Sequence, residues 1–168
     1  MKSNELLKLL SENYTAPTCA FIPEFRCGTG YSRETRADAI AMNLWPSMKD
    51  GLEIIGFELK VSRGDWLREV KNSHKASPIK QFCDRWYLVV SEASIVKDFD
   101  EIPRDWGFIF PKNGKLDFYK PAPKLEAVVP DKAFIAALMR RASRVDGMAH
   151  LVPTNNDWGK KTDYVVKG

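Results

Sequence analysis

The sequence predicts an α/β fold in which a central mixed β-sheet is flanked by α-helices, and three observations support this prediction. The apolar segment "LEIIGFELKVS" (residues 52–62) is the strongest strand candidate, and a segment with helical spacing follows it. A second apolar segment, "RWYLVVS" (residues 85–91), comes next, and this strand–helix–strand order predicts a right-handed crossover between parallel strands. Other strand candidates are joined by short turns, which favour antiparallel pairs.

The size and composition of the chain suit one domain. It has 168 residues, of which 44% are hydrophobic and 29% charged, as in an ordinary globular protein. No apolar run approaches the roughly 20 residues of a membrane span. The first residues, "MKSNELLKLLSENY", carry Glu5 and Glu12 among their leucines and lack the apolar block of a signal peptide. We therefore expect a single cytoplasmic domain over residues 1–168 that does not enter a membrane.

The first elements along the chain are a helix and two strands. Leucines recur with helical spacing near the N-terminus, which predicts a helix over residues 3–13. The segment "TCAFIPEFRCG" (residues 18–28) predicts a short strand with Pro23 near an edge or a bend. A second strand is expected in "TRADAIAMNLW" (residues 35–45), and the turn "PSMKDG" (residues 46–51) ends it.

The helix after the strongest strand has a clear start signal. Ser62 and Asp65 have the spacing of a capping box, and the apolar face of the helix begins at Trp66. Ser77-Pro78 then opens a second, short helical segment before the strand at residues 85–91.

The C-terminal part predicts a hairpin and one more helix. The segment "WGFIFPKNGKLDFYK" (residues 106–120) predicts a hairpin that turns at Asn113-Gly114. Asp131 is expected to cap the last clear helix. The chain from about residue 148 is polar, and we expect a flexible tail there.

Glu58 and Lys60 interrupt the strongest apolar strand. Side chains two apart on a strand point to the same face, so these two charges should lie together. The same triplet recurs as Glu69-Val70-Lys71 in the predicted helix, where residues two apart diverge. We interpret the first pair as part of a site and the second as surface residues.

Asp38 adds a second carboxylate to this region. It lies among alanines in the preceding strand and is separated from Glu58 by a turn, so the two strands should be antiparallel neighbours. Two buried carboxylates side by side repel unless a cation lies between them. A divalent metal would satisfy both, and Lys60 could then orient or deprotonate a bound water. The alternative is an internal salt bridge of Lys60 with either acid, but three converging charges favour a site.

The available ligands indicate which metal such a site would hold. The three cysteines form no CxxC pair and the two histidines lie far apart in sequence, so a zinc centre is not expected. Any metal in this site should therefore be a hard ion held by carboxylate oxygens.

Asp38, the "FELK" that ends a buried strand, and the helix and parallel strand after it resemble the PD-(D/E)XK nuclease superfamily. The stretch from Glu24 to Lys120 resembles the small single-domain members grouped with the MmcB-like DNA-repair proteins. The segments that carry this resemblance are "PEFRCGTG", "TRADAIAM", "IGFELKVSRGDW", "FCDRWYLVVS" and "WGFIFP". One departure is Ala37, which stands where the superfamily motif has proline.

The resemblance implies a restriction-endonuclease-like core and a set of site residues. Asp38 and Glu58 would be metal ligands with help from the Leu59 carbonyl, and Lys60 would be the catalytic lysine. Glu24 matches a glutamate that many members place beside the metal. An exposed acid without a role remains the alternative for Glu24.

The basic residues after the motif could hold nucleic acid. The formal charge of +4 is compatible with such a partner without requiring it. Basic side chains in this stretch would grip the DNA backbone without reading bases. They are Arg63, Arg68, Lys71, Lys75 and Lys80. The sequence does not select among the three lysines.

The expected function is therefore Mg²⁺- or Mn²⁺-dependent hydrolysis of DNA phosphodiester bonds, in DNA repair, recombination or phage DNA metabolism. One alternative is an accessory protein that binds DNA on a nuclease fold without cutting it. Another is a protein unrelated to nucleic acid in which the charges merely pair. A homodimer is compatible with the sequence, which leaves the oligomeric state open.

Overall fold

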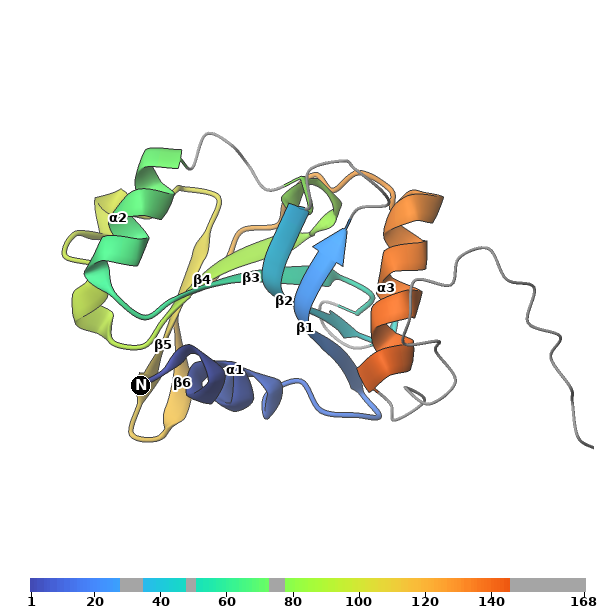
Figure 1. Cartoon of the computed structure of the whole chain (residues 1–168), viewed down its shortest axis with the longest axis horizontal. Helices are drawn as coiled ribbons and strands as arrows, with labels where there is room; N and C mark the ends of the chain where they lie inside the picture. The colour runs from blue at the N-terminus through green and yellow to red at the C-terminus, as the bar shows by residue number, and fades with distance from the viewer. Residues whose placement is uncertain (28–34, 48–50, 73–77, 146–168) are drawn as a thin grey trace, which may run out of the picture.

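The computed structural model describes residues 1–27, 35–47, 51–72 and 78–145. Within these ranges the chain forms one six-stranded sheet and three α-helices (Figure 1). The strands are β1 (Cys19–Cys27), β2 (Thr35–Asn43), β3 (Ile54–Lys60), β4 (Arg85–Val90), β5 (Gly107–Lys112) and β6 (Lys115–Lys120). The α-helices are α1 (Ser3–Ser11), α2 (Arg63–Asn72) and α3 (Lys132–Val145).

The sheet is mixed, as predicted, and its strands lie in the order in which they occur along the chain. The pairs β1–β2, β2–β3 and β5–β6 are antiparallel, whereas β3–β4 and β4–β5 are parallel. Helix α2 forms the connection between the parallel strands β3 and β4. The predicted α/β class is therefore confirmed. None of the helices in the described part of the chain is long and apolar enough to cross a membrane.

Local sequence signals account for the ends of several elements. The Ser62 hydroxyl accepts the N–H of Asp65 at 3.2 Å, which caps α2. An oxygen of Asp131 accepts the N–H of Phe134 at 2.7 Å and caps α3 in the same way. At the hairpin between β5 and β6, Asn113 and Gly114 have φ of 51° and 76°, as its two-residue turn requires.

Two predictions need a correction or lie beyond the structure. The second helical segment, expected to open at Ser77-Pro78, is only a short 3₁₀-helix over Lys80–Phe82. Ser77 and the predicted flexible tail from about residue 148 lie outside the described residues.

Apolar layers cover both faces of the sheet. On one face, Leu6 and Leu10 of α1 pack against a cluster that includes Phe57. On the other face, Trp66 of α2 and Phe134 of α3 pack against a second cluster. The central strands are therefore apolar on both sides, which explains why β3 and β4 read as continuous apolar runs.

Strand β1 is an edge of the sheet and is interrupted at two consecutive residues. Pro23 has no N–H to offer, and its carbonyl accepts Nε of Arg141 from α3 at 3.0 Å. The next residue, Glu24, has a φ of 49°, in the left-handed region that L-residues seldom adopt. Pro23 therefore lies at an edge, as the sequence predicted.

The sheet opens between β2 and β3. Their pairing runs from Met42 and Ile54 to Ala39 and Phe57 and ends there. Beyond that point β2 stays paired with β1 as far as Thr35, while β3 stays paired with β4 as far as Lys60. The first residues past the last pair are Asp38 and Glu58, so the opening begins at the predicted site.

Gly56 in β3 packs closely against Trp86 of the neighbouring strand β4. A Cβ on Gly56 would lie 2.3 Å from two ring atoms of Trp86, its pairing partner on β4. Gly56→Ala should therefore lower the free energy of unfolding by ~1–3 kcal/mol, the usual cost of overpacking. Urea denaturation provides the measurement.

The matched control is Gly64→Ala in α2, where the nearest atom would lie 4.0 Å away. This change should leave stability unchanged or raise it by up to ~1 kcal/mol, because alanine favours a helix over glycine. Equal stabilities of the two variants would contradict the close approach of Gly56 to Trp86.

Candidate active site

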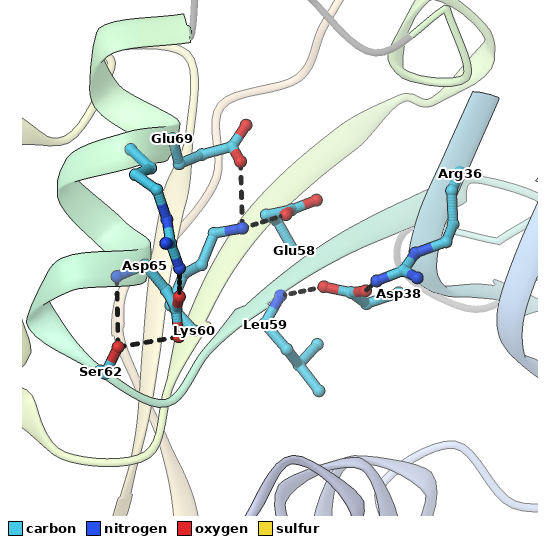
Figure 2. A network of polar contacts seen from close by, with 9 residues as sticks. Arg36, Asp38, Glu58, Leu59, Lys60, Ser62, Asp65 and Glu69 are labelled. Carbon is cyan, nitrogen blue, oxygen red and sulfur yellow. Dashed lines mark hydrogen bonds and ion pairs between the residues drawn. The ribbon is translucent and has the colours of Figure 1, made fainter. Parts of the chain in front are cut away.

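The opening between β2 and β3 is a polar cleft of about 380 Å³. Its walls come from the start of α1, from β2, from the end of β3 and from α2. Figure 2 shows the polar contacts of Arg36, Asp38, Glu58, Lys60, Asp65 and Glu69 in this cleft. The lining residues are Ser3, Arg36, Asp38, Glu58, Leu59, Lys60, Val61, Asp65, Arg68 and Glu69. The structure therefore brings the predicted residues Asp38, Glu58 and Lys60 into one cleft.

Asp38 is held at the wall of the cleft by two donors. Its Oδ2 accepts the backbone N–H of Leu59 at 2.8 Å, and its Oδ1 accepts a guanidinium N–H of Arg36 at 3.2 Å (Figure 2). The first bond replaces a strand partner, because β2 has already left β3 at this level. Asp38 thus fixes the local geometry of β3 and presents a carboxylate, 20% exposed, to the cleft.

Glu58 and Lys60 point the same way from β3, as strand periodicity predicts. Nζ of Lys60 donates to Oε1 of Glu58, and it lies 3.0 Å from Oε2 of Glu69 on α2 (Figure 2). The Lys60 side chain is 13% exposed and that of Glu58 16%. The residues of β4 that pair with Glu58 and Lys60 are Leu88 and Val90, and both are fully buried. The two charged side chains therefore lie beside apolar neighbours.

The surroundings raise the pKa of Glu58. The pKa is raised to about 7, mainly by burial and further by the nearby charge of Asp38, although Lys60 opposes both effects. For Lys60, burial lowers the pKa, but the neighbouring Glu58 and Glu69 outweigh burial and raise it overall. The cleft thus holds a lysine that stays protonated beside a carboxyl group that ionises reluctantly.

The ion pair considered as an alternative is present, but it does not account for the whole site. Lys60 pairs with Glu58 and Glu69, whereas Asp38 pairs with Arg36. Asp38 therefore adds its negative charge beside Glu58 and raises the pKa of that group.

Glu69 was interpreted above as a surface residue, and that interpretation is wrong. It lies in the cleft and contacts Lys60, while Lys71 is exposed as expected. Trp66 is fully buried against the sheet, and Glu69 follows it by three positions, so both lie on the inner side of α2. This spacing was available in the sequence and could have identified Glu69.

Two arginines line the mouth of the cleft. Arg36 comes from β2 and Arg68 from α2, with side chains 60% and 77% exposed. Arg68 donates to Asp65 and was one of the predicted DNA-contacting residues. Arg36 was missed, although its position two residues before Asp38 places both on one strand face.

Two further predicted basic residues, Arg63 and Lys80, do not line the cleft. Arg63 forms a bidentate ion pair with Glu101, and Lys80 forms an ion pair with Asp105. Both side chains therefore stabilise the fold through contacts within the protein. Lys75 lies outside the described residues.

Glu24 is not brought to the cleft lining. It is exposed on the edge strand β1, at the residue where the backbone turns left-handed. The alternative, an exposed acid without a direct part in the site, agrees with this position.

The donor set can hold a divalent cation through two protein carboxylates. No cluster of three or more histidine, cysteine or acidic residues suited to a metal is found in the part of the chain that the structure describes. Mg²⁺, however, is often bound through one or two carboxylates, with water and substrate phosphate completing its shell. Asp38 and Glu58 fit that requirement, provided that Glu58 releases Lys60.

Comparison with known proteins supports the fold. No family model and no curated protein matches the chain. A solved structure of a protein of unknown function from Silicibacter pomeroyi, SPO1766, is similar with a TM-score of 0.56. The match covers 92% of this chain and 99% of that chain at 17% identity. The arrangement of strands and helices thus recurs in another protein.

The raised pKa of Glu58 predicts how stability depends on pH in the absence of metal. In the unfolded chain this carboxyl ionises near 4.5, but in the folded protein it keeps its proton to about pH 7. The folded state binds more protons between these values, so stability should fall as pH rises through this window. Glu58→Gln should remove this loss and stabilise the protein at pH 8 by up to about 3 kcal/mol.

Urea unfolding of both proteins in EDTA at pH 5 and pH 8 measures the effect. Lys60 contributes equally at both values, because its raised pKa lies above this window. If the ion pair with Lys60 dominated, Glu58→Gln would instead destabilise the protein at pH 8 by ~3–5 kcal/mol.

Proposed function

We propose that this protein is a metal-dependent deoxyribonuclease that hydrolyses DNA phosphodiester bonds in the cleft between β2 and β3. The observation that carries the proposal is the convergence of Asp38, Glu58 and Lys60 where the sheet opens. The resemblance of these residues to the PD-(D/E)XK motif supports the same reaction, as does the wider resemblance to MmcB-like proteins.

The acids of the cleft support a role in metal binding. Asp38 and Glu58 project from neighbouring strands into one cleft, and their repulsion favours a cation between them. The Leu59 carbonyl is the further oxygen that the motif suggests as a ligand. A divalent cation bound there would neutralise phosphate charge and lower the pKa of its bound water.

Lys60 supplies the fixed positive charge. Attack on a phosphodiester adds an oxygen to a centre already surrounded by negative oxygens, so negative charge grows as the reaction proceeds. The Lys60 ammonium is held in the cleft by hydrogen bonds and can stabilise either the attacking hydroxide or this developing charge.

Arg36 and Arg68 would bind the substrate at the mouth of the cleft. Their guanidinium groups are well exposed and lie on either side of the acids, where the phosphates next to the scissile bond would pass. Such contacts give affinity without base recognition. The substrate would be DNA in repair, recombination or phage DNA metabolism, in the cytoplasm, and the enzyme could act as a homodimer.

Two observations favour a second function, DNA binding without cleavage. Among the described residues no group of three metal-binding side chains is found, and Lys60 is already paired with two glutamates. A protein of this kind would grip the backbone through Arg36 and Arg68 and leave the bond intact. Cleavage assays distinguish the two functions.

We expect purified protein to cut DNA in the presence of Mg²⁺ or Mn²⁺. Ca²⁺ should support binding with little turnover, because it is larger and coordinates less rigidly. Incubation of circular and linear DNA with each ion, followed by electrophoresis, measures this. Cleavage that persists unchanged in EDTA would reject the metal, and binding without cleavage in Mn²⁺ would favour the accessory role.

The lysines of the two similar triplets, Glu58-Leu59-Lys60 and Glu69-Val70-Lys71, allow a matched pair of substitutions. Lys60→Ala should lower the cleavage rate by at least ~100-fold, the usual scale for one electrostatic stabiliser. Lys71→Ala, on the exposed side of α2, should change the rate far less and mainly weaken binding as salt rises. Single-turnover rates at two salt concentrations make the comparison, and equal losses in the two variants would contradict the assignment of Lys60.

A further inference from the structure

Lys60 lies between two carboxylates that come from different elements. Glu58 is its neighbour on β3, and Glu69 reaches it from α2 across the cleft (Figure 2). The Lys60 side chain is largely buried, and a buried ammonium without a partner is strongly unfavourable. Either carboxylate alone could satisfy it, so the presence of both calls for an explanation.

The proposed reaction gives the two carboxylates different tasks. Glu58 is the acid that would bind a divalent cation, yet in the structure its Oε1 accepts a hydrogen bond from Lys60. Once Glu58 turns to a cation, it can no longer neutralise Lys60, and the two positive charges repel each other. Lys60 then needs a second carboxylate if it is to stay in the cleft.

We propose that Glu69 is a positioning residue that holds the Lys60 ammonium when Glu58 binds the metal. Its Oε2 is 3.0 Å from Nζ of Lys60, so the second partner is already in place. Glu69 thereby allows the cation and Lys60 to occupy the cleft together. This inference rests on the function proposed above and concerns a residue that the nuclease motif does not include.

Helix α2 does not depend on Glu69 for its own position. Trp66 is fully buried, its indole N–H donates to Glu101 at 3.1 Å, and Arg63 grips the same carboxylate. Ser62 caps the start of the helix. Replacement of Glu69 should therefore leave the fold intact, and its effects can be assigned to Lys60.

The test measures Mn²⁺ affinity by calorimetry, which requires no turnover. In Glu69→Ala, Lys60 must keep Glu58 for itself, so the affinity should fall by at least ~10-fold, the scale for losing a group that orients a metal ligand. Glu69→Gln should fall less, because its amide oxygen still accepts from Lys60. Glu92→Gln, an exposed acid outside the cleft, should leave the affinity unchanged.

The Lys60→Met background separates a positioning role from direct ligation. Without the ammonium, Glu58 is free to bind the metal, so adding Glu69→Ala should change Mn²⁺ affinity by less than ~2-fold. An equal loss in both backgrounds would make Glu69 a metal ligand and overturn the proposal. Unchanged affinity in the single variant would also overturn it.

Kinetics provide a second measurement that does not require the Lys60→Met protein to fold. At saturating Mn²⁺, Glu69→Ala should lower kcat with KM for DNA unchanged, and Glu69→Gln should recover part of the loss. A rise in KM alone would overturn the positioning role. Failure of the wild-type protein to bind Mn²⁺ would overturn the nuclease proposal itself, whereas wild-type binding that Glu69→Ala leaves unaltered would overturn only the role of Glu69.

Discussion

The hydrogen bond from the Leu59 N–H to the Asp38 carboxylate is the interaction on which the site depends. A strand that leaves its neighbour exposes backbone groups that must find other partners. Here the backbone of β2 no longer pairs with β3, and the Asp38 side chain accepts the Leu59 N–H instead, with 2.8 Å between N and Oδ2. The sheet can therefore open without an unsatisfied donor, and the same carboxylate enters the resulting cleft. The same residue, Asp38, thus satisfies the backbone where the sheet opens and supplies an acid to the cleft.

Periodicity in the sequence was sufficient for the core of the fold and for the shared face of Glu58 and Lys60, and the turn between the two strands was sufficient to place Asp38 beside them. The apolar runs of β3 and β4, with a capped helix between them, predict parallel neighbours because few other connections suit such a pattern. Glu58 and Lys60 share a face because a strand alternates. Two other features could not be predicted in this way: the point where the β2–β3 pairing ends, and the left-handed backbone of Glu24. Tertiary contacts determine both, and no local sequence pattern marks either of them.

Long-range pairing explains most of what the sequence did not predict. Arg63 and Lys80 read as members of a basic stretch, but their partners Glu101 and Asp105 come from much later in the chain. Glu69 contacts Lys60 because α2 packs back over β3, which depends on how Trp66 is buried. The sequence alone does not distinguish these basic residues. The role of each one depends on the acidic side chain with which it pairs in the folded protein.

The interruption of β1 has a consequence for self-association. An open edge strand normally offers a row of N–H and C=O groups to which another chain can add a strand. In β1 that row is broken in its middle, because Pro23 lacks the donor, Arg141 occupies its carbonyl, and Glu24 turns the backbone aside. An incoming strand could pair with only a few residues on either side of this break. Two copies of the protein therefore gain little from merging their sheets at β1, and this edge is protected against strand-to-strand aggregation.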